Sequence, residues 1–591
     1  MQTKHFVNDA NKLVAAALRS LAITRPELTL DAENKVLYAP EIRDGASHVS
    51  IISGGGSGHE PSFTGFVGEG FLSASVAGTV FASPSSRQVL AAIENVDGSK
   101  GVLVTVMNYT GDVLNFGVAL EKAKARNPAL QIEMLVVGDD VGVPRSRAGK
   151  VGRRGIAGTV LVHKVTGALA AAGYELPDVV RVGRLVAQNL ASIGVSLSHV
   201  HVPGRPRGDA SAEGLLAPDE VEIGMGIHNE AGCGRSSGGD AELPSVVSEM
   251  LRQLLDPSDA ERNFLPTRTA EAVVLINNLG ALSVLELGAV VTEVVDQLQG
   301  QYHITPVRVF AGTFMTSLDG PGFSVTLLNM VDTGVKMSLL ELLDAPSNVT
   351  GWQVPERRDI SSGKRGDKTG TTSKTDSPKS EQECLLECDL EMAQRRLEHG
   401  LKTIIAAEPE VTKYDSIVGD GDCGTTLKRG AEAVLNSLST YPPKNIIALL
   451  DQVAAAVEDS MDGTSGALYA IFLNSLTHYF KLYANQKATV DTKFWTEALA
   501  STLSALAKYT PAQVGDRTLV DALLPFAHAL QSTGNLQQAS QAAKDGAAKT
   551  ASMRPGLGRT VYIGNDESWF GKIPDPGAWG LSKFFDGLAQ Q

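Results

Sequence analysis

Short apolar runs alternate with helical patterns over the upstream part of the chain. Runs rich in β-branched residues predict strands at 49–52, 102–107, 132–137, 221–227, 273–276, 307–310 and 324–328. Apolar residues at helical spacing predict helices over 115–125 and 158–172. Such alternation is typical of an α/β fold. A break rich in proline and arginine at 203–207 divides this part into two lobes, at about 1–200 and 208–355.

The pattern changes to helix after helix downstream of residue 380. Ser380 and Glu383 form a predicted capping box, and apolar residues then follow at spacings of three and four from 386 to 404. Similar stripes run through 444–460, 467–481, 495–508 and 520–532, and again toward the C-terminus. Strand signals are scarce here. We therefore expect an all-α bundle over 381–591.

Between these two parts lies a polar stretch, 356–380, that reads ERRDISSGKRGDKTGTTSKTDSPKS. Serine, threonine, lysine, glycine and aspartate dominate it, with hardly an apolar residue. Such a segment cannot bury enough surface to offset its ordering entropy. The sequence therefore predicts a flexible linker between an α/β half, 1–355, and a helical half, 381–591.

Composition narrows the class of protein. A chain of 591 residues exceeds the size of one hydrophobic core, and 43% hydrophobic with 20% charged residues fits a soluble globular protein. A net charge of −14 argues against nucleic acid or an anionic membrane as the main partner. Four cysteines give neither a disulfide framework nor a zinc signature. Without a secretory signal or a long apolar run, a cytoplasmic location is expected.

The densest chemical signal is a cluster of three carboxylates at Asp415, Asp420 and Asp422, followed by Gly-Thr-Thr. Like charges repel, and a hard divalent cation such as Mg²⁺ neutralises them best while keeping room for substrate phosphates. An acidic surface turn is one alternative. An EF-hand loop is another, but no glutamate stands at its twelfth position. We favour a site for metal and nucleoside triphosphate.

The helical half contains further loops that could receive phosphate. The turn 460–466 feeds a helical run, where exposed amides and the helix dipole favour an anion. A plain interhelical turn with Thr464 or Ser465 as N-cap is the alternative. The loops 515–519 and 575–577 also bring polar groups to helix ends. No P-loop motif occurs, and the glycine-rich stretch 54–59 has His59 where a dinucleotide fingerprint ends in glycine.

Polar side chains follow three of the predicted strands in the α/β half. His59 ends the run Ser-Gly-Gly-Gly-Ser-Gly-His, Asp112 follows the strand at 102–107, and His228 follows the strand at 221–227. Open α/β sheets bind ligands beyond the carboxyl ends of their strands. Each residue alone is more often a capping or loop residue. Together they predict a nucleophilic imidazole and an acid–base pair around a small polar substrate.

These residues converge on one family. The chain resembles the ATP-dependent dihydroxyacetone kinases of the fused type, because it contains, in order, GGGSGHEP, NYTGDVLNFG, GRRGIAGTVLVHK, GMGIHNEAG, NNLG, GTFM, GDGDCGTT, TSGALY, GDRTLVDAL and DPGA. The resemblance covers nearly the whole chain except the linker. It implies a substrate-binding K half of two α/β lobes and a nucleotide-binding L half, a barrel-like bundle of eight helices.

The resemblance also implies roles for individual residues. His228 would hold the substrate ketone as a hemiaminal, with His59 and Asp112 as the acid–base groups. The residues implied around the substrate are Gly56, Ser57, Gly58, His59, Met107 and Asp112, where Met107 replaces a lysine of some relatives. Asp415, Asp420 and Asp422 would hold two Mg²⁺ ions against the triphosphate. The implied nucleotide contacts are Asp422, Cys423, Gly424, Thr425, Thr464, Ser465, Thr510, Thr518, Leu519, Asp575, Pro576 and Gly577.

The implied reaction is phosphorylation of dihydroxyacetone, and of D-glyceraldehyde, by ATP. The resemblance further implies a homodimer in which the L half of one subunit meets the K half of its partner. Three alternatives remain open. They are cleavage of FAD to a cyclic riboflavin phosphate at the nucleotide site, a non-catalytic ketone sensor, and a form that takes phosphate from a carrier protein.

Overall fold

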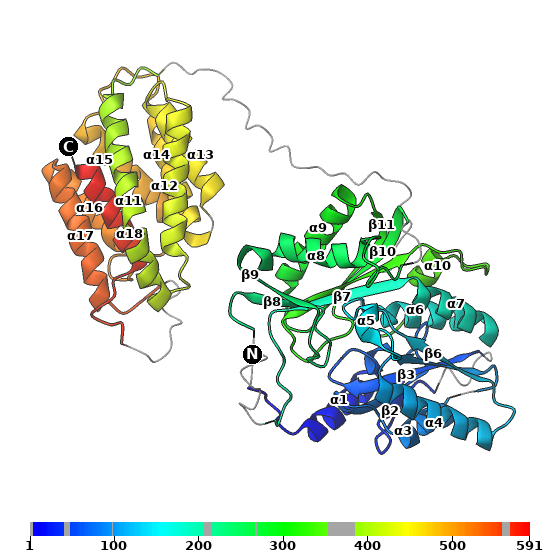
Figure 1. Ribbon diagram of the computed structural model, residues 1–591. Coiled ribbons are helices and arrows are strands. Elements are labelled where there is room, and N and C mark those ends of the chain that lie inside the picture. Colours follow the sequence, from blue (N-terminus) through cyan, green and yellow to red (C-terminus); the bar gives the residue numbers. More distant parts are fainter. Residues whose placement is uncertain are drawn as a thin grey trace. The chain divides into compact units, whose positions relative to one another are not determined.

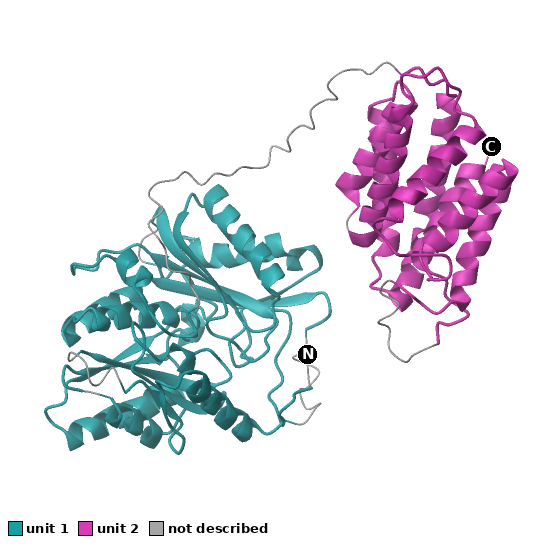
Figure 2. Ribbon diagram, turned by 180° about the vertical axis from the view of Figure 1, so that it is seen from behind, with its two compact units in different colours: residues 1–364 teal, residues 365–591 magenta. Residues whose placement is uncertain are grey.

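The structure of the protein is a computed structural model that describes residues 4–40, 48–96, 98–205, 216–265, 269–352, 384–461, 463–557 and 568–590. The chain forms two compact units, residues 1–364 and 365–591 (Figure 2). The boundary between the units falls within the segment predicted to link them. That segment, 356–380, and the predicted capping box of Ser380 and Glu383 lie outside the described residues.

The first lobe of unit 1 is built on a six-stranded sheet with the order β1-β2-β4-β3-β5-β6. The strands are β1 (Thr29–Asp31), β2 (Val36–Tyr38), β3 (Ser50–Ser57), β4 (Ala74–Val80), β5 (Val102–Met107) and β6 (Ile132–Val137), and the helices are α1 (Ala10–Thr24), α3 (Ser86–Glu94), α4 (Thr110–Arg126), α5 (Arg145–Ala148), α6 (Thr159–Ala171) and α7 (Leu176–Gln188). Strands β3, β4, β5 and β6 pair in parallel. Because β4 and β5 flank β3 on opposite sides, the sheet has a topological switch point at the carboxyl end of β3.

The second lobe has another six-stranded sheet, with the order β11-β10-β12-β7-β8-β9. It contains β7 (Leu190–Ser196), β8 (Glu220–Ile223), β9 (Gly234–Ser237), β10 (Glu271–Asn278), β11 (Thr305–Gly312) and β12 (Gly322–Asn329), together with α8 (Leu243–Leu255), α9 (Val284–Gly300) and α10 (Leu339–Asp344). Strand β7 precedes the break at 203–207. The chain therefore enters the second lobe earlier than that break suggested.

The two lobes share one core. In Figure 1, α6, α7 and α10 lie between the two sheets, α3 and α4 cover the outer face of the first sheet, and α8 and α9 cover that of the second. Successive side chains on a strand point to opposite faces of the sheet. On β3, Ile51 therefore belongs to the shared core and Ile52 to the core under α3 and α4. Sheets covered on both faces read as continuous apolar runs, so β5 and β6 match the predicted ranges 102–107 and 132–137.

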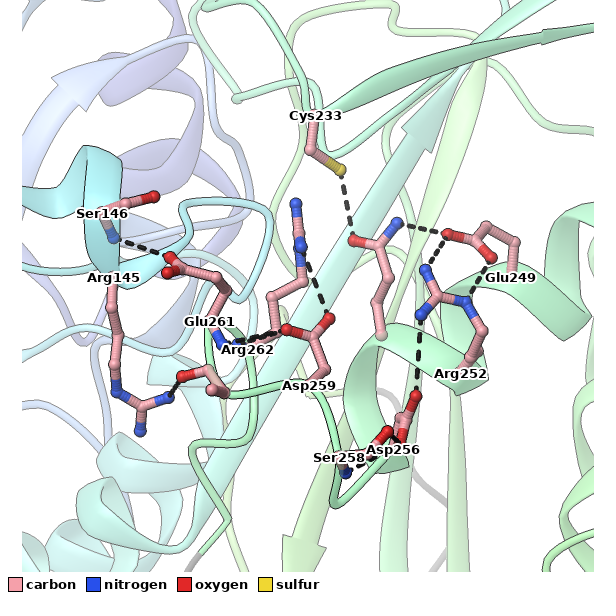
Figure 3. Close-up of polar contacts among 12 residues, drawn as sticks. Arg145, Ser146, Cys233, Glu249, Arg252, Asp256, Ser258, Asp259, Glu261 and Arg262 are labelled. Atoms are coloured by element: carbon pink, nitrogen blue, oxygen red, sulfur yellow. Dashed lines mark hydrogen bonds and ion pairs between the residues drawn. The ribbon is translucent and has the colours of Figure 1, made fainter.

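A polar network fastens the loop after α8, in the second lobe, to α5 of the first (Figure 3). The Arg145 guanidinium donates to the carbonyl oxygens of Ala260 and Asn263, both at 2.8 Å. The Ser146 N–H donates to the Glu261 carboxylate at 2.7 Å. These contacts tie the lobes together at the surface, beyond the shared core.

Unit 2 contains eight described helices and no described strand of its own. They are α11 (Leu390–Val418), α12 (Cys423–Thr440), α13 (Ile446–Ser460), α14 (Gly463–Leu482), α15 (Thr492–Leu506), α16 (Val520–Thr533), α17 (Leu536–Lys549) and α18 (Pro576–Ala589). Each helix packs against the next, and α18 packs against α11, so the helices close into a ring. The predicted fold class, two α/β lobes followed by an eight-helix barrel-like bundle, is confirmed. None of the described helices has the length and apolar character that crossing a membrane requires.

The packing of α6 against the loop before β4 gives a test of the shared core. A Cβ atom on Gly167 would lie 2.4–2.6 Å from main-chain atoms of Phe71. We expect Gly167→Ala to destabilise unit 1 by about 1–3 kcal/mol, because neither backbone can move freely away. Thermal unfolding measures the change. The matched control is Gly288→Ala in α9, where the added atom meets nothing within 4 Å and a small gain is expected. Equal melting temperatures for Gly167→Ala and the unmodified protein would contradict this packing.

Candidate active site

The carboxyl end of β3 carries the glycine-rich loop in a conformation that only glycine fits well. Gly58 has a φ of +101°, in the left-handed region, and a Cβ on Gly56 would lie 2.7 Å from the Ala82 nitrogen. The Ser57 hydroxyl donates to the Gly78 carbonyl oxygen at 3.0 Å. The glycine-rich stretch is therefore pinned to β4 and to the residues directly after it, and it delivers His59 to the switch point of the sheet.

His59 is fully buried and held in one tautomer. Its Nδ1 lies 2.8 Å from the Thr316 carbonyl oxygen. A carbonyl oxygen only accepts hydrogen bonds, so Nδ1 carries the proton. Burial, with the nearby His228, lowers the pKa of His59 to about 3. The ring is therefore neutral near pH 7, with an unprotonated Nε2.

His228 comes from the second lobe and meets His59 edge to edge. The two Nε2 atoms lie 3.0 Å apart. Phe81 and Tyr109 approach the His228 ring at near-perpendicular angles, with ring centroids 5.2 and 4.8 Å away. Strand β8 ends at Ile223, earlier than the predicted range 221–227, because Gly224 turns the chain with a φ of +77°. His228 therefore lies in a loop rather than directly at a strand end.

Asp112 completes this group from the first turn of α4, which begins five residues before the predicted helix 115–125. Its side chain is buried, and Oδ1 has no hydrogen-bond partner among the described residues. Burial raises the pKa of Asp112 to about 6, although a hydrogen bond from Ser83 opposes the shift. Oδ1 lies 3.9 Å from the position that a Cβ on Gly55 would take, and the Phe63 ring lies 3.0 Å from the same position.

One segment after β11 holds both histidine loops, and only the motif GTFM pointed to it in the sequence. The main-chain N–H groups of Thr316 and Leu318 donate to the His59 and Gly58 carbonyl oxygens, at 3.1 and 2.7 Å. The Ser317 hydroxyl donates to the Ile227 carbonyl oxygen at 2.7 Å. The distance between His59 and His228 is thus fixed by a third segment.

Met107 lies at the end of β5 within the shared core, with an exposed fraction of 2%. A Cβ on Gly155 would meet its Cβ at 2.7 Å. The structure thus describes packing for Met107, and a substrate contact by this residue stays a prediction.

In unit 2 the three carboxylates converge. One ligand oxygen from each of Asp415, Asp420 and Asp422 can be chosen so that all lie within 4.8 Å of one another. Asp415 is buried in the last turn of α11, and its Oδ2 accepts the Cys423 N–H at 2.9 Å. The other two acids are exposed in the turn before α12. Three carboxylates with two open to solvent are a donor set that fits Mg²⁺, which prefers oxygen ligands and retains water.

All but one of the predicted nucleotide residues lie at or just before the N-termini of helices. Cys423, Gly424 and Thr425 begin α12, Thr464 and Ser465 lie in the first turn of α14, Thr518 and Leu519 directly precede α16, and Asp575, Pro576 and Gly577 begin α18. Thr510 instead follows the C-terminus of α15. Cys423 interacts electrostatically with Asp415 and Asp575, and its thiol forms a hydrogen bond with the Ser465 side chain. The starts of α12, α14 and α18 therefore meet beside the carboxylates, where several helix dipoles point positive ends at one place.

Arg517 organises this end of the bundle and was not predicted as a site residue. It is 1% exposed, and its guanidinium donates to the carbonyl oxygens of Thr550 and Ile573 at 3.1 and 2.8 Å and lies over the Trp569 ring. The Asp521 carboxylate accepts the N–H groups of Gly515 and Thr518, at 2.6 and 2.8 Å. Arginines are mostly exposed and rarely adopt a positive φ, but Arg517 is buried with a φ of +62°. Its role is therefore visible only in the folded structure.

The fold and the two sites define a class: an α/β half in which a buried imidazole contacts a partly exposed one, joined to a helical half suited to a metal-bound nucleotide. Comparison with known proteins makes this class specific. Residues 19–351 match the Dak1 domain and residues 417–590 match the DAK2 domain. Dihydroxyacetone kinase of Komagataella pastoris is 42% identical, with 100% of this chain and 98% of that protein covered. Human triokinase/FMN cyclase is 36% identical, with 98% and 97% covered.

A solved structure agrees with these relatives. The dihydroxyacetone kinase of C. freundii in complex with AMP-PNP and Mg²⁺ is 32% identical and aligns with a TM-score of 0.60, covering 100% of this chain and 99% of that one. The chain belongs to the dihydroxyacetone kinase family.

Proposed function

We propose that the protein phosphorylates dihydroxyacetone with ATP and Mg²⁺ to give dihydroxyacetone phosphate. The observation that carries the proposal is the Nε2–Nε2 contact of 3.0 Å between His59 and His228, beside an unpartnered Asp112 oxygen, in a chain that also groups three carboxylates. Relatives named dihydroxyacetone kinase that match over the full length support it.

His228 would bind the substrate through a covalent bond. Its Nε2 attacks the ketone carbon, and the resulting hemiaminal selects a carbonyl compound over glycerol, which offers only hydroxyl groups. Asp112, whose ionised form has a free oxygen, then accepts the proton of the hydroxyl that receives phosphate. Hydrogen bonds alone would separate two such small molecules poorly.

Asp415, Asp420 and Asp422 would hold Mg²⁺, which neutralises the charge of the triphosphate during phosphoryl transfer. We propose two ions, as the family resemblance implies. The nucleotide would lie against the starts of α12, α14 and α18 and the loop before α16, with the residues named above. Since the two half-sites belong to separate units, closure between an L half and a K half assembles them.

Three finer points belong to the same proposal. D-Glyceraldehyde, with its own carbonyl, is a second substrate. The protein forms a homodimer in which each L half serves the partner's K half, and it works in the cytoplasm. The name of the human relative, triokinase/FMN cyclase, favours a second activity, the splitting of FAD at the nucleotide site. A non-catalytic sensor would have no use for the grouped carboxylates.

Replacing His228 tests the covalent step. We expect His228→Ala to lose the substrate adduct, and turnover to fall at least about 100-fold, because a positioned reacting group is removed. Mass spectrometry of the protein with dihydroxyacetone and a coupled assay for dihydroxyacetone phosphate measure the two effects. Normal kinetics in this variant, or a glycerol rate close to the dihydroxyacetone rate in the unmodified protein, would refute carbonyl capture.

Replacing Asp420 tests the metal site independently of the covalent site. Asp420→Ala should lower ATP-dependent turnover at least about 100-fold, because the protein loses a ligand of the metal ion, which stabilises the charge of the transition state by several kcal/mol. Adduct formation on His228 should persist. Asp451→Ala is the matched control, since Asp451 pairs with Lys481 on neighbouring helices of the same unit. Turnover of Asp420→Ala equal to that of the control, across a Mg²⁺ titration, would rule out this metal site.

The pH profile tests Asp112 as the proton acceptor. Burial raises the pKa of Asp112 to about 6, and only the ionised form accepts a proton. We therefore expect kcat/KM for dihydroxyacetone to fall about tenfold per pH unit below pH 6. Burial raises the pKa of Asp575 to about 6 as well, so the limb should persist in Asp575→Asn at saturating ATP. If the fall of kcat/KM below pH 6 disappeared in Asp575→Asn and remained in Asp112→Asn, the titrating group would be Asp575 in the helical half, and Asp112 would not be the proton acceptor.

A further inference from the structure

Glu230 grips the His228 side chain from the side opposite His59. One oxygen, Oε1, lies 2.9 Å from His228 Nδ1, and the other, Oε2, accepts the His228 main-chain N–H at 2.9 Å. The two contacts together fix both the backbone and the ring of one residue. Glu230 therefore sets which nitrogen of His228 faces the substrate space: Nδ1 is occupied, and Nε2 points toward His59.

The hydrogen bonds also determine where the protons are. His59 Nδ1 carries its proton toward Thr316, so the neutral His59 ring can only accept at Nε2. The 3.0 Å contact between the two Nε2 atoms then requires a proton on His228 Nε2. A carboxylate only accepts, so His228 Nδ1 carries a second proton. His228 is thus an imidazolium, paired with an ionised Glu230.

His228 and, to a smaller extent, Arg154 keep Glu230 ionised. Burial by itself raises the pKa of Glu230, but the His228 hydrogen bonds and the charges of His228 and Arg154 outweigh it and lower the pKa to about 2. Arg154 is itself fixed, because it pairs with the buried Asp140 at 2.7 Å and donates to the Gly224 carbonyl oxygen at 2.8 Å. It comes from the first lobe and grips the loop of the second that carries His228.

Gly226 has no side chain where the Glu230 carboxylate and the Arg154 guanidinium approach the main chain. A Cβ on Gly226 would lie 2.1 Å from Glu230 Oε2 and 2.5 Å from Arg154 Nη1. Both charged atoms therefore flank one small volume beside the main chain. The other end of the same loop is anchored through Cys233, whose thiol donates to Gln253 on α8 at 3.2 Å (Figure 3).

We infer that Glu230 is a positioning residue and the charge partner of His228, with the fixed cation of Arg154 nearby, so that the hemiaminal forms without exchanging a proton with solvent. The inference rests on the proposed function. It deepens that function by naming the group that compensates the charge of the covalent complex.

The step balances within the site. The Nε2 proton of His228 passes to His59 Nε2, and the freed lone pair forms the C–N bond to the ketone carbon. The π pair of the carbonyl moves to its oxygen, which takes the proton from His59. The substituted ring keeps its Nδ1 proton and its positive charge, as before the reaction. Glu230 faces a cation at the start and at the end, and no proton enters or leaves.

The surroundings of His228 offer no second carboxylate in contact with Nδ1 among the described residues. Tyr109 and Phe81 present ring edges or faces, His59 faces Nε2, and Asp112 interacts with His228 only electrostatically. The proton balance should therefore respond to Glu230 specifically.

The test measures protons exchanged when dihydroxyacetone binds to the full-length protein without ATP. Calorimetry at pH 7 in buffers of different ionisation enthalpy gives this number, and carbon-13 NMR with label at the ketone carbon confirms the adduct. In the unmodified protein we expect an adduct with proton exchange near zero. In Glu230→Gln, whose amide oxygen still accepts from Nδ1, we expect affinity to fall about tenfold or more and proton uptake to appear. The control Glu133→Gln, at a surface carboxylate of β6 that pairs with Arg184, should match the unmodified protein.

Each outcome decides something. Proton uptake approaching one in the unmodified protein would overturn the inference even if Glu230→Gln failed to fold. Unchanged affinity and proton exchange in a folded Glu230→Gln would overturn it as well. An unmodified protein that binds dihydroxyacetone without any adduct would instead refute the proposed hemiaminal, and a Glu230→Ala variant weaker than Glu230→Gln would support the orienting contact.

Discussion

The contact between His59 and His228 is the constraint on which the α/β half depends. It joins the end of β3 in one lobe to a loop of the other, and it works only if each ring is held in one orientation. The Thr316 carbonyl oxygen holds the first ring and Glu230 holds the second. The shared core of α6, α7 and α10 and the network around Arg145 keep the lobes at the required distance. Pre-organisation of this kind removes the cost of orienting two groups at the moment of reaction.

The helical half solves a different electrostatic problem. It brings together a carboxylate from the last turn of α11 and two from the turn before α12, stabilises the buried one through the Cys423 N–H, and places helix N-termini beside them. Negative ligands for a cation and positive helix ends for phosphate lie side by side. Arg517, a buried residue of the loop before α16, holds two further segments at this end of the bundle. Neither half has all the groups that phosphoryl transfer to a ketose requires.

The sequence predicted those parts whose physics is local. A strand buried on both faces, such as β5, reads as a continuous apolar run, and amphipathic helices such as α16 show apolar stripes. Five strands were missed. Strands β1, β2 and β9 have only three or four residues, and the buried strands β4 and β7, which read ASVAGTV and LASIGVS, mix alanine, serine and glycine with their apolar residues. The predicted site residues His59, Asp112 and His228 come together, as do the three acids. Glu230 and Thr316 were not found, since the first acts through a turn at Asn229 (φ +66°) and the second through a main-chain carbonyl.

The central claim is that the imidazole pair captures a carbonyl by forming a bond. A crystal structure of the protein soaked with dihydroxyacetone, without ATP, tests it most directly. The account predicts continuous density from His228 Nε2 to a tetrahedral substrate carbon, with His59 Nδ1 still bonded to Thr316 and Glu230 still bonded to Nδ1. A planar ketone in van der Waals contact with Nε2 would contradict it.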